Sequence, residues 1–198
     1  RRARSRGWLA VELPRLIVIT DWSLGEATLL SRLEQALAAG PGVAVQHRHP
    51  EASARAFFDE GVKLEALCQR FSAPLFINRR LDVALALGAW LHLPAYGLLP
   101  ADVQGRVPVV SVAVHSEDEA KRAAGADLAL VSPVFGKGDA TPLGLEGFAR
   151  LAAMLPFPAY ALGGVTAPVP GARGHAVISH VLRATDPRAA ARALLAGD

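Results

Sequence analysis

The sequence predicts an α/β fold of the TIM (β/α)₈ barrel type. Eight short runs of aliphatic and β-branched residues are spaced from one end of the chain to the other. Longer amphipathic stretches separate most of these runs, and this alternation is typical of βα units around a parallel sheet. The 198 residues suffice for one domain, at the short end of the range for this barrel. We expect a tail at residues 1–13 and a single barrel domain at residues 14–198.

The first half of the chain alternates strands and helices regularly. Three leucines recur at helical spacing within residues 23–39, and Gly40 then stops that helix. The next helix carries Phe57 and Leu67 on its apolar face, and Gly88 ends the third helix. The eight strands are expected at residues 16–20, 43–46, 74–77, 90–93, 109–112, 128–131, 158–162 and 176–179.

In the second half, helix-capping signals mark the helices. Ser116 with Glu119 three residues later forms a capping-box pattern, and Gly125 is expected to end that helix. A helix is expected at about residues 145–155, and Asp186 is expected to cap the last one. Between the seventh and eighth strands the chain is short and contains two prolines, which oppose a helix. We predict that a short loop replaces the helix there.

Composition excludes several classes of protein. Hydrophobic residues make up 52% and charged residues 20%, which rules out a disordered polymer. The longest apolar run, residues 83–94, contains Gly88 and His92 and is too short to span a membrane. The single cysteine, Cys68, cannot form an internal disulfide, and we expect a cytoplasmic protein. Four arginines lie in the first six residues, so the folded part lacks the positive surface that a nucleic-acid partner requires.

The active site of this fold lies at the carboxyl ends of the strands. Gln46 and Arg48 alternate onto the same face of the second strand, so both are expected to point into the barrel mouth. The alternative is that they form a salt bridge and a hydrogen bond that close the barrel top. The other polar residues expected at strand ends are Asn78, His115 and Ser132.

A phosphate site is expected at the loops that follow the seventh and eighth strands. Barrels commonly bind phosphate there through backbone N–H groups. Gly163 and Gly164 follow the seventh strand, where a missing Cβ lets an anion approach the backbone. Ile178 and Ser179 end the eighth strand and add a hydroxyl and a helix start. The expected ligand is therefore a small phosphorylated molecule.

A metal site is weighed and not predicted. His47 and His49 form an H-x-H pattern, which binds zinc in some hydrolase barrels. Such a site needs further histidines and an acidic ligand on later strands, where this chain offers Ser132 and Ser179. We expect no metal and no cofactor.

Several motifs together resemble the thiamine-phosphate synthase and TenI family. They occur in the family's order and cover nearly the whole chain. They are LIVITD from residue 16, VQHR from residue 45, INRRLDVALALGAWLHL from residue 77, SVAVHSEDEAKRAAGADLALVSPVF from residue 111, then PLGLEGF, LGGVT and AVIS. The resemblance implies a phosphorylated heterocycle as ligand, a role in thiamine biosynthesis and association into homo-oligomers.

The departures from the family pattern concern one subsite. The resemblance implies that synthases hold Mg²⁺ and a diphosphate with an Asn-Asp pair after the third strand and an Asp after the fourth. Here Asn78 is kept, but Arg79 and Gly97 occupy the two acidic positions. The family's Thr-x-Thr-Lys segment is replaced at residues 137–140. The lysine that the resemblance implies two residues after the arginine of the VQHR motif is Pro50 here. A hard cation prefers carboxylate oxygens, so diphosphate chemistry is not favoured.

What remains is the half of the site that the resemblance assigns to thiazole phosphate, together with His115. Val114-His115-Ser116 matches the V-H-S sequence of TenI, an aminothiazole tautomerase whose histidine is the proposed acid–base group. A tautomerase moves a proton between two carbons, and histidine is suited to this step because its usual pKa lies near physiological pH. Lys137 is a candidate to replace part of the lost phosphate contacts, or else a solvated loop lysine.

The predicted function is therefore a TenI-like thiazole phosphate tautomerase. One alternative is a thiamine-phosphate synthase with a divergent diphosphate site, because synthases often carry a histidine at the same position. Another is a non-catalytic binding or regulatory homologue, in which the ring of His115 only orients the helix that begins at Ser116.

Overall fold

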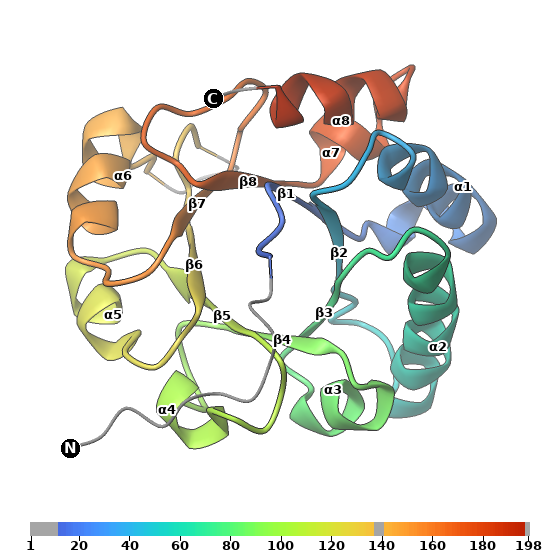
Figure 1. Cartoon of the computed structure of the whole chain (residues 1–198), viewed down its shortest axis with the longest axis horizontal. Helices are drawn as coiled ribbons and strands as arrows, with labels where there is room; N and C mark the ends of the chain where they lie inside the picture. The colour runs from blue at the N-terminus through green and yellow to red at the C-terminus, as the bar shows by residue number, and fades with distance from the viewer. Residues whose placement is uncertain (1–11, 137–140, 197–198) are drawn as a thin grey trace.

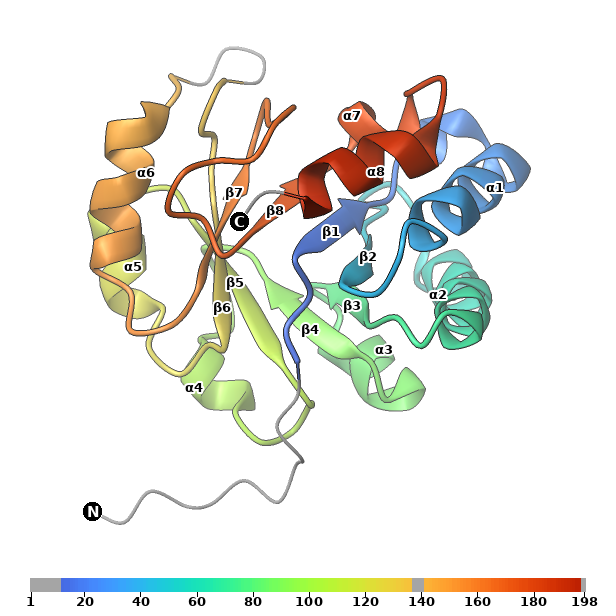
Figure 2. The same ribbon diagram turned by 45° about the horizontal axis from the view of Figure 1, so that its top comes forward.

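The computed structural model describes residues 12–136 and 141–196. Within these residues eight parallel strands pair in the order β1 to β8, and β8 pairs with β1 to close the barrel (Figure 1). Helices surround the barrel, with α1, α2 and α3 on one side and α5 and α6 on the other (Figure 2). The predicted (β/α)₈ barrel is confirmed.

All eight strands form close to their predicted positions. They are β1 Leu16–Ile19, β2 Val43–His47, β3 Leu75–Asn78, β4 Trp90–Leu93, β5 Val110–Val114, β6 Leu128–Val131, β7 Ala159–Leu162 and β8 Gly174–Val177. The boundary predicted for β8 is wrong by two residues. Gly174 already pairs with Tyr160, and the strand ends at Val177, so Ser179 begins a helix instead of ending the strand.

The helices are shorter than predicted. The α-helices are α1 Glu26–Leu37, α2 Ala54–Arg70, α3 Leu81–Leu87, α4 Pro100–Val103, α5 Glu117–Arg122, α6 Gly144–Ala153, α7 Ser179–Leu182 and α8 Pro187–Leu195. The helix expected at 23–39 is divided, because Gly25 adopts a positive φ of 78° between the 3₁₀-helix Trp22–Leu24 and α1. None of the described helices is long and apolar enough to cross a membrane.

The connection between β7 and β8 is a loop, as predicted. Residues 163–173 contain no helix, and Pro168 and Pro170 lie within this segment. The prolines lack the N–H groups that a helix would need. This loop therefore carries the chain from the carboxyl end of β7 back to the start of the parallel strand β8.

The strand residues divide into two packed layers because successive side chains point to opposite faces. One set, which includes Leu16 and Val18, packs against the surrounding helices. The other set fills the barrel interior with Ile17, Phe76 and Tyr160 among its members. Burying each large apolar side chain contributes about 2 kcal/mol, so this interior is a packed core and not a channel.

The amino-terminal end of the barrel is closed by large side chains and backbone. Phe76 and Trp90 meet edge to face with their ring centroids 5.0 Å apart. The buried Tyr160 hydroxyl donates a hydrogen bond to the carbonyl of Pro14. A ligand must therefore enter from the opposite end, where the strands terminate.

Gly174→Ala is expected to destabilise the barrel by about 3 kcal/mol, because overpacking a closed core forces neighbouring groups apart. A Cβ at Gly174 would lie 2.5 Å from the Arg15 carbonyl oxygen and 2.5 Å from the Tyr160 ring. The free energy of unfolding from urea denaturation measures the effect. Gly61→Ala on α2 is the control, because the closest atom to its Cβ is the flexible end of Leu87 at 3.0 Å. Equal stability of the two variants would contradict this account of the packing.

Candidate active site

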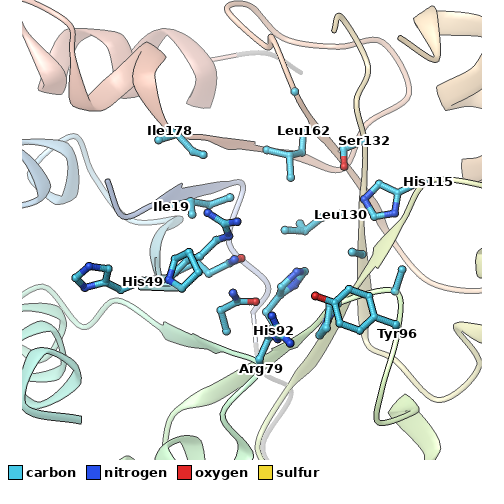
Figure 3. A pocket seen from close by; sticks show the side chains of 18 of the residues that line it. Ile19, His49, Arg79, His92, Tyr96, His115, Leu130, Ser132, Leu162 and Ile178 are labelled. Atoms are coloured by element: carbon cyan, nitrogen blue, oxygen red, sulfur yellow. The ribbon is translucent and has the colours of Figure 1, made fainter. Parts of the chain in front are cut away.

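A cavity of about 870 Å³ opens at the carboxyl ends of the strands (Figure 3). Its volume is typical of a site for a small organic ligand. Ser132, Leu162 and Ile178 lie on one side, Arg79, His92 and Tyr96 lie on the other, and His115 lies at one end (Figure 3). The cavity is thus enclosed by residues from many strands, with both apolar and cationic groups on its wall.

Most of the predicted site residues line this cavity. They are Gln46, Arg48, Asn78, His115, Ser132, Gly163 and Ile178. Gly164 and Ser179 follow two of these residues in the chain but do not belong to the cavity wall itself. Lys137 lies outside the described residues. Residues predicted from several different strands therefore meet at one cavity.

The structure adds apolar residues that the sequence analysis did not single out. Ile19, Leu130 and Leu162 line the cavity with their aliphatic side chains. Each alternates with an outward-facing neighbour on its strand, so a period-of-two pattern could have identified them. Tyr96, in the segment after β4, also lines the wall and is 65% exposed. No periodic signal points to a residue in such a loop.

His115 is held by Glu119, one turn along the start of α5. The Glu119 carboxylate accepts a hydrogen bond from the His115 backbone N–H at 2.6 Å and lies 2.8 Å from the ring Nδ1. A carboxylate only accepts, so Nδ1 carries a hydrogen, and in the neutral ring Nε2 is the nitrogen with the lone pair. Both residues belong to the cavity wall.

The capping box predicted for this helix is only half formed. The Ser116 hydroxyl caps α5 by accepting from the Glu119 N–H at 3.3 Å. The Glu119 carboxylate does not return to the Ser116 N–H, because it bonds His115 instead. The Glu119 carboxylate therefore orients the ring of His115 instead of completing the capping box.

His92 is a buried, uncharged histidine in the cavity wall. Its Nδ1 lies 2.7 Å from the Ser111 hydroxyl, and only 6% of the residue is exposed. Burial, with additional repulsion from His115 and Arg48, lowers the pKa of His92 to about 3. His92 is therefore neutral at physiological pH and offers hydrogen bonding without charge.

The H-x-H pattern is explained by packing beside the cavity. The His47 Nε2 donates to the Phe57 carbonyl at 2.9 Å, and the two rings stack 3.9 Å apart. His49 stacks on Trp22 and pairs through Nδ1 with Glu60 at 2.9 Å. Each histidine thus has its own structural partner, and among the described residues no three potential metal ligands come together.

Arg48 presents a cation to the cavity from a fixed backbone. Its N–H donates to the Thr20 hydroxyl at 2.9 Å, and that hydroxyl donates to the Arg48 carbonyl at 2.9 Å. Within the described residues, no carboxylate forms an ion pair with its guanidinium, so the alternative of a salt bridge that closes the barrel top is not found. Gln46 is 2% exposed, and its side-chain oxygen accepts no hydrogen bond from the described residues.

Gly163 and Gly164 are required by a close approach of protein to protein. A Cβ at Gly163 would lie 2.8 Å from the Cα of Pro133, and one at Gly164 would lie 2.9 Å from the Phe135 Cβ. Both glycines also have positive φ, 94° and 68°. The reason given from the sequence, access of an anion to the backbone, is thus not needed to explain them. Packing on the segment after β6 suffices.

The comparisons with known proteins agree with the barrel fold. The family described as thiamine monophosphate synthase matches residues 16–181. The thiamine-phosphate synthase of Chloroflexus aurantiacus is 35% identical over 198 residues, which covers 92% of this chain and 91% of the relative. That of Roseiflexus castenholzii is 37% identical over 195 residues, covering 89% and 85%. The chain belongs to the thiamine monophosphate synthase family.

A solved structure supports the same assignment. The thiamine phosphate pyrophosphorylase from Pyrococcus furiosus superposes with a TM-score of 0.78 at 30% identity, covering 91% of this chain and 93% of that one. These relatives are named for the synthase reaction, which favours the synthase alternative over the predicted tautomerase. The comparisons do not separate the two kinds of family member, and the tautomerase stays a prediction.

The residues present do not fit the Mg²⁺ site that the family resemblance implies. The two acidic positions are Arg79 and Gly97. Among the described residues that line the cavity the acidic one is Glu119, and it is already engaged with His115. A divalent cation needs several oxygen ligands and is repelled by a guanidinium. This family member therefore differs from the implied pattern at the metal position.

Because His47 is buried, we expect the protein to lose stability in mild acid. The pKa of His47 falls to about 4 in the folded state, chiefly because burial disfavours the charged form. An unfolded histidine has a pKa near 6.5, so stability is complete above that pH and declines as pH falls toward the folded pKa. From pH 7.5 to 5, His47 alone is expected to cost about 2 kcal/mol.

Urea unfolding at the two pH values measures this loss. His47→Gln keeps a donor for the Phe57 carbonyl but removes the titrating group. The variant is expected to lose less stability than the wild type between pH 7.5 and 5. An identical loss in both proteins would show that His47 does not contribute.

Proposed function

We propose that the cavity binds a thiazole phosphate and that His115 transfers a proton on it, which is the reaction of a TenI-like tautomerase. The observation that carries the proposal is the His115–Glu119 pair on the cavity wall. A histidine held by a carboxylate is suited to general acid–base catalysis. Because the family's two acidic metal ligands are replaced, a reaction that needs no metal fits this site better than one that does.

The hydrogen bond from Nδ1 to Glu119 leaves the His115 Nε2 as the reactive atom. In a tautomerisation Nε2 removes a proton from one carbon of the heterocycle and returns a proton at another. The ring passes through an imidazolium, which the Glu119 carboxylate stabilises by accepting from Nδ1 at 2.8 Å. No atom is gained or lost, so no cofactor is required.

The remaining cavity residues would position the substrate. The phosphate would lie at the loops after β7 and β8, near Gly163, Gly164, Ile178 and Ser179, where barrels commonly bind phosphate. The first residue of α7 is Ser179, and this helix begins without a side-chain cap. Ile19, Leu130 and Leu162 give the heterocycle apolar contacts. The polar groups that would fix its orientation are Gln46, Arg48, Asn78 and Ser132.

A second candidate is the coupling reaction of a thiamine-phosphate synthase. It is favoured by the names of relatives that are 35–37% identical over about nine tenths of the chain. Against it stand Arg79 and Gly97 at the acidic positions. A non-catalytic homologue is the third possibility, in which the His115–Glu119 pair only fixes the start of α5.

His115→Gln is expected to lower the rate of thiazole phosphate isomerisation by about 10²- to 10⁴-fold, the usual contribution of a positioned acid–base group. Glu119→Gln should lower the rate less, because it weakens the support of the imidazolium but keeps the base. The rate of isomerisation is measured by nuclear magnetic resonance, from the loss of the substrate's proton signal. Glu117→Gln, on the same helix but paired with Arg150, is the control and should retain activity. A fully active His115→Gln protein would sink the proposal.

Calorimetry separates the two enzymatic candidates. The wild type is expected to bind thiazole phosphate in the absence of Mg²⁺ and of any second substrate. It is expected to bind the pyrimidine diphosphate weakly even with Mg²⁺, because the carboxylates for the metal are missing. Tight binding of the diphosphate that depends on Mg²⁺, together with thiamine phosphate formation, would establish the synthase instead. Binding of thiazole phosphate with no turnover in either assay would support the non-catalytic homologue.

A further inference from the structure

A second cavity lies on the outer side of the barrel wall, beside the loop between β7 and β8. This loop, residues 163–173, stands where a (β/α)₈ barrel usually carries a helix, and it runs between α6 and α8 (Figure 1 and Figure 2). The cavity measures about 1090 Å³ and shares no lining residue with the candidate active site. Its wall includes Ala159, which begins β7, and Arg15, which precedes β1. We call it the outer cavity, and it lies near the amino-terminal ends of the strands.

Most of the outer cavity wall is apolar. Phe157, from the segment after α6, lines it together with Pro168 and Pro170 of the loop. The ring of each proline fixes its φ, which restricts the conformations open to this wall. The Ala172 N–H donates to the Val169 carbonyl at 3.1 Å, so the loop also closes a turn at the wall. An apolar surface with few polar groups is typical of a site for a small organic ligand.

His175 contributes to this wall a buried hydrogen-bond donor that the described residues leave unpaired. The residue is 4% exposed, and the Val169 N–H donates to its Nε2 at 2.9 Å. Nε2 therefore has the lone pair, and in the neutral ring Nδ1 carries the hydrogen. Burial, with additional repulsion from Arg15, lowers the pKa of His175 and so favours the neutral ring. Nδ1 has no partner among the described residues, and a buried donor without an acceptor is unfavourable.

The charged side chains on the outer cavity wall are both cationic. They are Arg15 and Arg173, and no acidic residue of the described chain lines this cavity. The Arg173 N–H donates to the Ala159 carbonyl at 2.9 Å, which continues the pairing of β7 with β8. Because side chains alternate along an extended chain, Arg173 and His175 lie on the same outer face. Within the described residues no carboxylate forms an ion pair with the exposed Arg173 guanidinium.

We propose that the outer cavity binds a small carboxylic acid with a flat apolar body. The carboxylate accepts hydrogen bonds from the Arg173 guanidinium and from the Nδ1–H of His175, and the apolar body packs against Phe157 and the two loop prolines. Charge complementarity decides the class of ligand, since a cation would be repelled by the arginines and an uncharged hydrocarbon would leave the His175 donor unpaired. The site is independent of proton transfer at His115, because the two cavities share no residue.

Benzoate is the probe that tests this site, by nuclear magnetic resonance on the full chain labelled with nitrogen-15. The backbone amide signals of Val169 and Ala172 are expected to shift and saturate as benzoate is added. The Nδ1–H signal of His175 is expected to move downfield, because this hydrogen gains an anionic acceptor. Benzamide has nearly the same shape without the charge, and it should bind about tenfold more weakly than benzoate. Signals from the candidate active site are followed in the same spectra, so binding in either cavity is read separately.

Arg173→Gln separates the contribution of charge from that of the apolar wall. The variant is expected to bind benzoate about tenfold more weakly and benzamide as the wild type does, because only the carboxylate uses the guanidinium. Arg173 is exposed, and the thermal unfolding midpoint verifies that the variant folds. Arg55→Gln is the matched control, since it removes an exposed cation that pairs with Asp59 and lines neither cavity. This control should bind benzoate as the wild type does.

Three results would overturn the proposal. Benzoate-dependent shifts confined to the candidate active site, at His115 and Ser132 for example, would mean that the carboxylate binds there and not in the outer cavity. Equal benzoate affinity in the wild type and Arg173→Gln would show that the guanidinium is only solvated. Signals of residues 165–175 that change with protein concentration, and not with benzoate, would show that a second copy of the chain covers this face instead.

Discussion

The two-residue alternation of side chains along eight parallel strands is the constraint on which the rest of the structure depends. In a closed barrel every strand residue faces either the helices or the interior, and no sheet edge is left to adjust. The interior positions near the strand starts carry large apolar groups such as Phe76, Trp90 and Tyr160. Those near the strand ends carry Gln46, Asn78 and other smaller or polar groups. The same alternation therefore fills one end of the barrel and leaves a cavity at the other.

The segments that follow the strands give this cavity its chemistry, and they do so through local backbone contacts. The Glu119 carboxylate makes two such contacts at the start of α5. It orients the ring of His115 and also accepts a hydrogen bond from the His115 backbone N–H. The hydroxyl of Thr20 similarly exchanges two hydrogen bonds with the backbone of Arg48, across the pair of strands β1 and β2. A small barrel with brief loops can position reactive groups in this way because each loop is short and tied to a neighbour.

The sequence predicted those features that arise from periodicity, and missed those that arise from side-chain geometry. Gln46 and Arg48 were placed on the cavity by alternation alone, and Ile19 and Leu130 could have been placed by the same rule. The role of Glu119 was missed because a capping-box pattern does not reveal which N–H a carboxylate will choose. Ser179 was assigned to a strand because a helix of one turn has no periodic signal. At Gly163 and Gly164 the need for glycine is predictable from the sequence, but its structural cause, the packing of residues 133–136, is not.

Membership of the thiamine monophosphate synthase family and the side chains of the cavity constrain function at different levels. Family membership rests on a match over residues 16–181 and on the barrel shared with a solved relative. The reaction rests on a few residues, and a replacement of carboxylate by guanidinium at Arg79 reverses the sign of the charge offered to a ligand. Arg48 and Arg79 line the cavity and form no ion pair with the described residues, so they attract oxyanions and repel divalent cations. The His115–Glu119 pair has no net charge when the imidazole is protonated. The charges on the described cavity wall thus favour an anionic ligand over a divalent cation, whichever reaction follows.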